Sequence, residues 1–240
     1  FIRDAVRAFN VPAVELPGFE ADDLIATYVR QARQRDARVT IVSSDKDLMQ
    51  LVGPGVDMLD PMKNAHIGPD QVREKFGVDP EKVVEVQALA GDSSDNVPGI
   101  PGIGVKTAAQ LINEYGDLDA LLARAGEIKQ PKRRESLLEH AELARISRQL
   151  VRLRDDAPAP LSVDDMGLKH PDPKQLLRFL SEMEFNTLMR RIAAEMNVAA
   201  PDPGVEMGAQ AAIVETGERG RPGATLAGLA APIDPRAYEM

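Results

Sequence analysis

The alternation of strand-like and helix-like segments in the first 60 residues limits the fold more than any other feature. Residues 37–42 read ARVTIV, a β-branched run typical of a buried strand, and VDMLD at 56–60 is a second candidate strand. PAVEL at 12–16 is a further short strand candidate, and apolar residues at helical spacing predict a helix over 20–35. This alternation indicates an α/β fold with a parallel sheet.

Beyond residue 60 the pattern changes to helices whose ends are marked by Gly, Pro and Asp. The expected helices are PDQVREKFG, a segment from Asp79-Pro80 to Leu89, 105–115, a single long helix over 133–152, and one that begins at Asp172-Pro173. We expect residues 1–85 to form the later half of an α/β core and residues 86–197 a helical region. The Ala, Gly and Pro content of 198–230 is typical of a linker, and 231–240 resembles the start of a further domain.

Composition restricts the partners and the compartment. The chain has 38 acidic and 29 basic residues, a net charge of −9, which by itself argues weakly against nucleic-acid binding unless cations fill an acidic site. It has no cysteine, so disulfides and thiolate metal sites are excluded, and no apolar run approaches the ~20 residues of a membrane span. The first residues lack the apolar segment of a signal peptide. A cytoplasmic protein without a membrane partner is expected.

Acidic residues gather where predicted strands end. FEADDL follows the PAVEL segment, SSDKDL follows the strand at 37–42, and GDSSDN lies further along the chain. Ligands in open α/β sheets bind beyond the carboxyl ends of the strands, so the first two groups should meet there. Clustered carboxylates need cations to stay ionised, and oxygen ligands without His or Cys suit Mg²⁺ or Mn²⁺. Two such ions can cleave a phosphodiester.

Each acidic motif also has a simpler interpretation. EADD alone is typical of acidic residues that favour the first turn of a helix, SDKD of a solvated turn, and GDSSDN of a helix end followed by an Asx turn. Only the combination of the three groups makes a metal site as well supported as these simpler interpretations.

A glycine turn, PGIPGIGVKTA, opens the helix at 105. Gly99, Gly102 and Gly104 allow close backbone approach, and the free N–H groups of a helix N-terminus bind phosphate. The spacing matches neither a P-loop nor a dinucleotide-binding fingerprint. An ordinary turn between two helices is the alternative. The basic run KQPKRR at 129–134 either continues a phosphate track or is a solvated face.

Together these motifs resemble the 5′ nuclease family, most closely the N-terminal 5′→3′ exonuclease region of bacterial DNA polymerase I. The matching stretches are GFEADDLIAT, VSSDKDLMQLV, GPDQVREKFGV and GDSSDNVPGIPGIGVKTAAQLI. LSEMEFNTLMRRI is similar to the segment that closes this region, so the resemblance covers about residues 1–195.

The resemblance implies a PIN-like or resolvase-like α/β nuclease core followed by a helix–three-turn–helix DNA-binding region. It implies metal ligands at Glu20, Asp22, Asp23, Asp45, Asp47, Asp92 and Asp95. Of these, Glu20, Asp22, Asp45 and Asp92 are the expected catalytic residues. The expected DNA-binding residues are Gly99, Gly102, Ile103, Gly104, Lys106 and Thr107. The implied cofactors are two Mg²⁺ or Mn²⁺ ions, with K⁺ on carbonyl groups of the glycine turn.

The family's first strand with its aspartate, a second aspartate and a basic helical arch would precede Phe1. The resemblance therefore implies an internal fragment with little cleavage activity of its own, whose residues 231–240 begin a 3′→5′ exonuclease-like domain. The implied substrate is DNA with a 5′ flap, a nick or an RNA primer, bound by a monomer continuous with polymerase domains.

Two functions from other classes are weighed against this nuclease. A non-catalytic, structure-specific DNA-binding module would use only the glycine turn and would not need seven acidic residues at these positions. An acidic interaction scaffold would have no affinity for DNA. Metal-dependent cleavage of a flap substrate separates all three.

Overall fold

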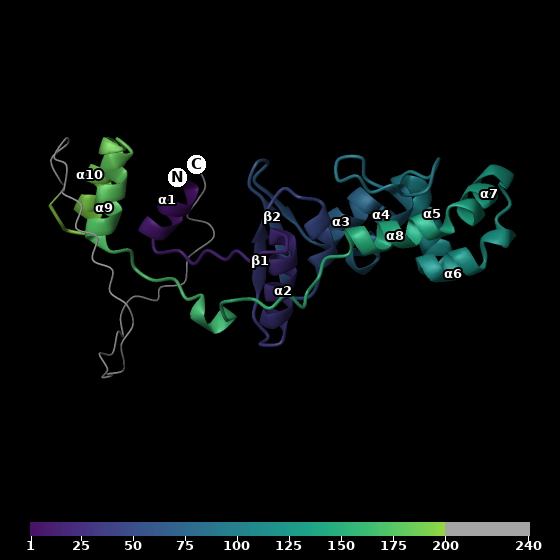
Figure 1. Ribbon diagram of the computed structural model, residues 1–240, viewed down its shortest axis with the longest axis horizontal. Helices are drawn as coiled ribbons and strands as arrows, with labels where there is room; N and C mark the ends of the chain where they lie inside the picture. The colour runs from purple at the N-terminus through teal and green to yellow at the C-terminus, as the bar shows by residue number, and fades with distance from the viewer. Residues whose placement is uncertain (200–240) are drawn as a thin grey trace.

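The computed structural model describes residues 1–199 of the 240. The predicted linker, from residue 200 onward, and the predicted domain start at 231–240 lie outside the described residues. Within the described part the chain is elongated, with a small sheet near its centre and groups of helices toward either end (Figure 1). None of the helices in this part is both long and apolar enough to cross a membrane.

The sheet has three strands in the order β1-β2-β3. β1 (Val39–Val42) pairs in parallel with β2 (Val56–Asp60), and β3 (Ala65–Ile67) adds to β2 in the antiparallel direction. The parallel pair confirms both strands predicted at 37–42 and 56–60. The sheet as a whole is mixed, because the short connection from β2 to β3 permits only a hairpin.

The strand predicted at 12–16 is wrong. Residues 11–16 have no regular secondary structure and pair with no strand of the sheet. Their alternating apolar residues suit an extended chain, but a strand also requires a hydrogen-bonded neighbour, which the pattern cannot reveal. The acidic group at 20–23 therefore follows an extended segment instead of a strand end.

Helices make up most of the remaining structure. In the first half they are α1 (Ile2–Ala8), α2 (Ala21–Arg33), α3 (Pro69–Phe76) and α4 (Val83–Ala90). In the second half they are α5 (Val105–Tyr115), α6 (Leu118–Ala123), α7 (Pro131–Glu139), α8 (Ala141–Val151), α9 (Pro173–Glu182) and α10 (Asn186–Glu195). Short 3₁₀ segments are η1 (Asp47–Leu51), η2 (Pro80–Lys82), η3 (Ala125–Glu127) and η4 (Val163–Asp165).

Several predicted boundaries are confirmed, whereas the long helix over 133–152 is wrong. α5 spans the predicted 105–115, and Asp172 caps α9 by accepting hydrogen bonds from the first-turn N–H groups. The predicted long helix is two helices, α7 and α8, separated at His140, whose φ of −109° and ψ of 22° are not helical. No Gly or Pro marks this break, so it has no local signal in the sequence.

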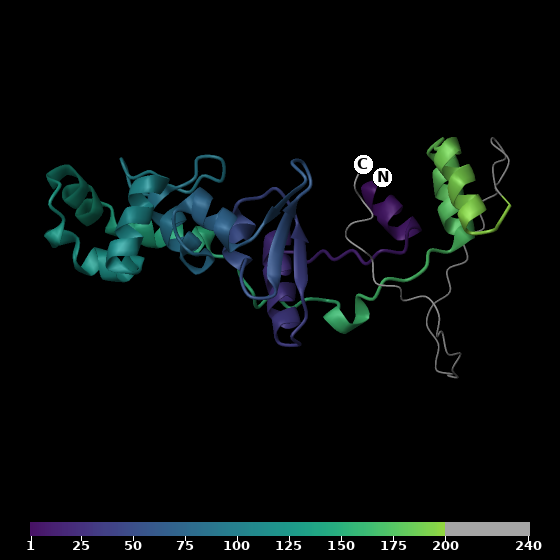
Figure 2. The ribbon, with the colours of Figure 1, turned by 180° about the vertical axis from the view of Figure 1, so that it is seen from behind.

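Two larger hydrophobic cores and a small cluster of Val84, Val97 and Val151 hold the described residues together. The larger core runs from the sheet, through Ile41 and Met58, into α4, α5, α6 and α8. The smaller core joins α1 with α9 and α10 around Leu176 and Met189. In Figure 2 these three helices lie together at the end of the chain opposite α5 and α7. The larger core therefore joins the acidic residues near the sheet to the helices that carry the glycine turn.

Candidate active site

The first acidic group caps a helix. Glu20 is the N-cap of α2, and its side chain and that of Asp23 form a reciprocal capping box. Asp23 also accepts a hydrogen bond of 2.9 Å from the backbone N–H of Arg154, where the chain returns along α2. The capping interpretation therefore holds for Glu20 and Asp23. Both oxygens of Asp23 accept hydrogen bonds from backbone N–H groups, so this residue also holds the start of α2 and the segment at Arg154 in place.

Asp22 has different surroundings from its neighbours. Burial raises the pKa of Asp22 from 3.8 to about 6, with further increases from the nearby charges of Asp45, Asp47, Glu20 and Asp23. These influences show that the acids of α2 and those that follow β1 share one region, as the sequence predicted. A group of carboxylates that repel one another in this way is suited to a cation.

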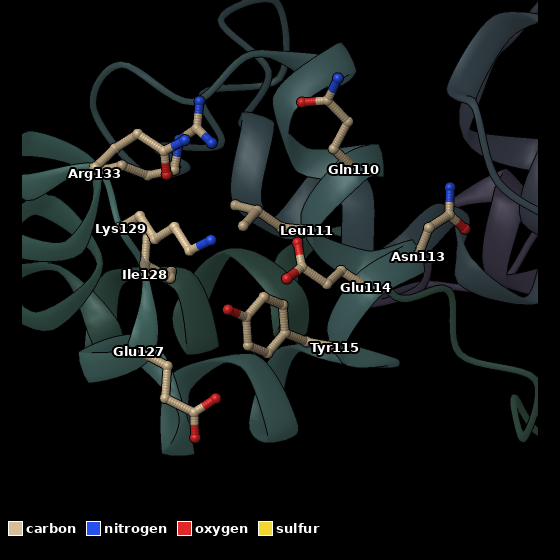
Figure 3. Close-up of a pocket in the computed structure, with 10 residues that line it drawn as sticks. Gln110, Leu111, Asn113, Glu114, Tyr115, Glu127, Ile128, Lys129 and Arg133 are labelled. Atoms are coloured by element: carbon tan, nitrogen blue, oxygen red, sulfur yellow. The ribbon is translucent and has the colours of Figure 1, made fainter.

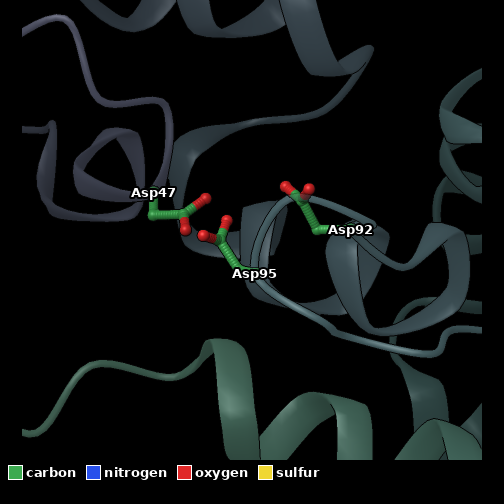
Figure 4. A group of neighbouring side chains, drawn as sticks. All are labelled: Asp47, Asp92 and Asp95. Carbon is green, nitrogen blue, oxygen red and sulfur yellow. The ribbon is translucent and has the colours of Figure 1, made fainter.

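A second group brings together Asp47, Asp92 and Asp95. Each offers one carboxylate oxygen, and the three oxygens lie within 4.8 Å of one another. Asp47 is the first residue of η1, after β1, whereas Asp92 and Asp95 come from the loop after α4. Figure 4 shows the carboxylates of Asp47 and Asp95 facing each other, with Asp92 beside them. Residues 45 positions apart thus form one group.

Gln87 positions Asp47 within this group. It lies on α4, is only 4% exposed, and donates a hydrogen bond from Nε2 to Oδ1 of Asp47. Burial raises the pKa of Asp47 while this hydrogen bond lowers it. Oε1 of Gln87 is buried without a hydrogen-bond partner among the described residues. An orphaned buried oxygen beside a carboxylate indicates that a further donor or a cation belongs there.

Asp92 is the most strongly held acid of the group. Its Oδ2 contacts the ammonium of Lys46, and its Oδ1 accepts hydrogen bonds from the N–H and hydroxyl of Ser94. The bond from Lys46, followed by those from Ser94, lowers the pKa of Asp92 to about 2. Asp92 is therefore ionised throughout the physiological range and available as an anionic ligand.

The donor set fits a hard divalent cation. Asp47, Asp92 and Asp95 supply oxygen atoms only, and Asp22 and Asp45 add carboxylates close by. Mg²⁺ and Mn²⁺ prefer such ligands, whereas zinc sites usually include His or Cys. All three residues of this group are among the seven predicted acids.

The glycine turn has a buried half and an exposed half. Gly99 is buried, and its N–H donates a 3.0 Å hydrogen bond to the hydroxyl of Ser147, a fully buried residue of α8. A Cβ at Gly99 would lie 2.4 Å from the backbone nitrogen of Gly91, and φ is +61°. Ile103 is 4% exposed and belongs to the larger core. Gly99 and Ile103 therefore shape the turn, and their side-chain positions do not face solvent.

The exposed half of the turn lies at the start of α5. Gly102, Gly104 and Lys106 are exposed, and nothing lies within 4 Å of a Cβ added at either glycine. Gly104 is the N-cap of α5 and has no side chain to satisfy the first N–H groups of the helix. Together with Lys106 and the half-buried Thr107, these N–H groups form an exposed, positively polarised surface.

The basic run after η3 borders a separate hollow. This hollow of about 710 Å³ lies between α5 and the segment that leads into α7. Figure 3 shows Lys129 and Arg133 across from Glu114 and Tyr115 of α5. Its lining mixes acidic and basic side chains, and it does not include any of the predicted metal ligands. The arrangement leaves both interpretations of the KQPKRR run open.

Comparisons with known proteins define the family. The model of the 5'-3' exonuclease N-terminal resolvase-like domain matches residues 1–77, and that of the 5'-3' exonuclease C-terminal SAM fold matches residues 78–174. A DNA polymerase I from Rhizobium leguminosarum is 58% identical over 206 residues, which cover 85% of this chain and 20% of that protein. The chain thus spans about a fifth of the length of this relative.

Solved structures share the fold. The T5 5'-exonuclease with bound divalent metal ions (zinc) has a TM-score of 0.54 at 26% identity, covering 57% of this chain and 51% of that one. The bacteriophage T5 D15 flap endonuclease, solved as a pseudo-enzyme-product complex with DNA and metal ions, has a TM-score of 0.53 at 22% identity, covering 75% and 61%.

The fold and the acidic group define a resolvase-like nuclease core joined to a helical domain. The chain belongs to the 5'-3' exonuclease family, and it is similar to part of a bacterial DNA polymerase I.

Sequence reasoning missed three residues that the structure places around the site. Gln87 and Lys46 contact the acids, and Ser147 holds the glycine turn. Gln87 could have been recognised from the sequence, because a polar residue in the apolar helix VVEVQALA requires a buried partner. Lys46 lies between two predicted ligands, yet nothing in the sequence indicates that it reaches Asp92. Ser147 lies 48 residues from Gly99, and no local pattern links them.

Proposed function

We propose that this chain forms the metal-binding and duplex-binding part of a 5′ nuclease that hydrolyses phosphodiesters in DNA with a 5′ flap, a nick or an RNA primer. The observation that carries the proposal is the convergence of Asp47, Asp92 and Asp95 within 4.8 Å, close to Asp22 and Asp45. Family membership and the T5 relatives with metal ions and DNA support it.

The acidic residues would act as ligands for two Mg²⁺ or Mn²⁺ ions. Bound ions would supply an activated water and stabilise the charge that develops on the leaving oxygen. Asp22 and Asp45 would hold the ion on the sheet side, and Asp92 and Asp95 would hold the one on the helical side. Asp47 adjoins both groups, and Gln87 keeps its carboxylate aimed at them.

The exposed half of the glycine turn would bind the duplex. The N–H groups at the start of α5 and the ammonium of Lys106 would contact backbone phosphates, which fixes position without reading sequence. K⁺ on carbonyl groups of this turn stays a prediction. The carbonyls of Ile100 and Pro101 already accept hydrogen bonds, from the N–H of Ile103 and the hydroxyl of Ser136.

The test uses the complete product of the gene that encodes this chain, with a radiolabelled 5′-flap duplex. We expect cleavage that requires Mg²⁺ or Mn²⁺ and that falls about a thousandfold in Mg²⁺ when Asp92 is replaced by Asn, while the duplex still binds in Ca²⁺. Binding without cleavage at any metal concentration would identify a non-catalytic DNA-binding module instead. Absence of both binding and cleavage would refute the proposal altogether.

A further inference from the structure

Within residues 1–199, Lys46 is the one lysine or arginine whose side chain pairs with the acidic residues of the site. It lies between Asp45 and Asp47 in the sequence, but its ammonium contacts Asp92, on the loop after α4. Among residues 1–199, no other Lys or Arg forms an ion pair with any of the seven predicted ligands. The contact is largely shielded, because the Asp92 side chain is 10% exposed and that of Lys46 is 34% exposed.

The carboxylate of Asp92 is a partner both for Lys46 and for a bound metal ion. Asp92 belongs to the three-acid group whose oxygens suit a divalent ion, yet one of its oxygens is engaged by Lys46 and the other by Ser94. A divalent ion bound between Asp47, Asp92 and Asp95 would repel the ammonium at short range. The lysine and the metal ion therefore compete for Asp92.

We propose that Lys46 is an exchangeable counter-cation of this site, which neutralises Asp92 while no metal is bound and moves to a DNA phosphate once a divalent ion occupies the carboxylates. The inference rests on the proposed function, since it assumes that the acids bind metal. A lysine suits this exchange because it carries a compact charge on a flexible stem, so its ammonium can change partner without moving the backbone.

The first part of the inference predicts effects of opposite sign from one substitution. In Lys46→Met the repulsion of the metal ion is removed, so the Mn²⁺ affinity measured by calorimetry should rise about threefold or more. Without metal, the unneutralised acids should lower the melting temperature by about 2 °C or more, and saturating Mn²⁺ should abolish this difference. If Lys46 had only a structural role, Lys46→Met would weaken both metal binding and stability.

Matched controls isolate the charge at this position. Lys46→Arg keeps a cation and should bind Mn²⁺ within about twofold of the unmodified protein. Lys63→Met removes a lysine that pairs with Asp60 outside the acidic group, and it should leave Mn²⁺ affinity unchanged. Unchanged or weaker Mn²⁺ binding in Lys46→Met would overturn the inference.

The second part concerns DNA. In Ca²⁺, binding of a 5′-flap duplex by Lys46→Met should depend less on salt, with the slope smaller by about one unit for one lost phosphate contact. In EDTA the slope should be unchanged, because Asp92 then holds the ammonium. Equal slopes in Ca²⁺ would refute the transfer to phosphate.

This inference and the proposed function fail in different ways. If the acids do not bind metal, any Mn²⁺ binding by the unmodified protein is unaffected by Asp92→Asn. If the acids bind metal but Lys46 has no such role, Asp92→Asn weakens Mn²⁺ binding while Lys46→Met leaves it unchanged.

Discussion

The acidic group and the glycine turn are neighbours in sequence but are held in different ways. The carboxylates of Asp92 and Asp95 are held by contacts with Lys46 and Ser94. The turn is fixed by its backbone: the N–H of Gly99 donates to Ser147, and the N–H of Ile100 donates to the carbonyl of Leu89. One region depends on charges that can be exchanged, and the other on a chain path that tolerates no added atom at Gly99.

This difference indicates how the two regions should respond to substitution. A change of side chain among the acids alters charge and ligand number but leaves the chain path intact, so chemistry should suffer before folding. A change at the buried half of the turn moves the backbone, so folding should suffer first. A substitution in the exposed half of the turn should change DNA affinity alone.

The largest expected effect is on catalysis. Asp92→Ala in the complete protein should lower the single-turnover cleavage rate of a 5′-flap duplex about a thousandfold, because the metal site loses a ligand and the charge stabilisation that depends on it. High Mn²⁺ should restore part of the rate, since Asp47 and Asp95 remain. Asp45→Ala, on the sheet side, should not be rescued. If high Mn²⁺ restored the cleavage rate of both variants equally, the sheet side and the helical side would not differ in their roles.

The next effect is on folding. Gly99→Ala should reduce the free energy of unfolding by about 3 kcal/mol, from backbone overlap with Gly91 and a left-handed φ. Gly104→Ala is the matched control, because a Cβ there meets nothing within 4 Å and φ is −93°. It should cost less than about 1 kcal/mol. Chemical denaturation measures both, and similar losses in the two variants would contradict the division of the turn.

A smaller effect is expected on binding. Lys106→Ala should weaken duplex affinity about three- to tenfold at moderate salt, independent of base sequence, and reduce the salt slope by about one unit. Lys174→Ala, which changes another exposed lysine, on α9, is the control. Fluorescence anisotropy in Ca²⁺ gives both values. A loss that varies with base sequence would show that the turn does not act through phosphates.

The smallest effect is on the pH dependence of stability without metal. The pKa of Asp22 is raised from 3.8 to about 6 in the folded protein, so its ionised form opposes folding above about pH 6 and this cost disappears as the pH falls toward 3.8. In EDTA, Asp22→Asn should therefore melt higher than the unmodified protein at pH 8, with the difference shrinking toward pH 5. A difference independent of pH would show that Asp22 does not carry the repulsion among the acids.

Local patterns in the sequence predicted part of this arrangement. Strong signals at single elements, such as the β-branched run at 37–42 and Gly116 after α5, gave the correct elements. The strand at 12–16 failed because strand formation depends on a partner distant in sequence. The prediction of one helix over 133–152 failed because α7 and α8 make separate contacts with the glycine turn. Ser136 of α7 contacts Pro101, and Ser147 of α8 contacts Gly99.

The site shows the same limit. The seven acids were identified from their motifs, and the structure shows which of them meet. The sequence could not show that Asp23 serves a cap and a loop, or that Lys46 reaches Asp92. These contacts join segments that are up to 131 residues apart, and only the folded chain brings them together.

A double-mutant cycle shows whether the two regions act independently, the acidic residues on metal and the glycine turn on DNA. Duplex affinity is measured in Ca²⁺ for the unmodified complete protein, Asp92→Asn, Lys106→Ala and the double variant. Lys106→Ala should weaken binding by the same factor with and without Asp92→Asn, with a coupling energy below about 0.5 kcal/mol. A coupling energy above about 1 kcal/mol would contradict this independence, because the two regions would then bind DNA as one unit.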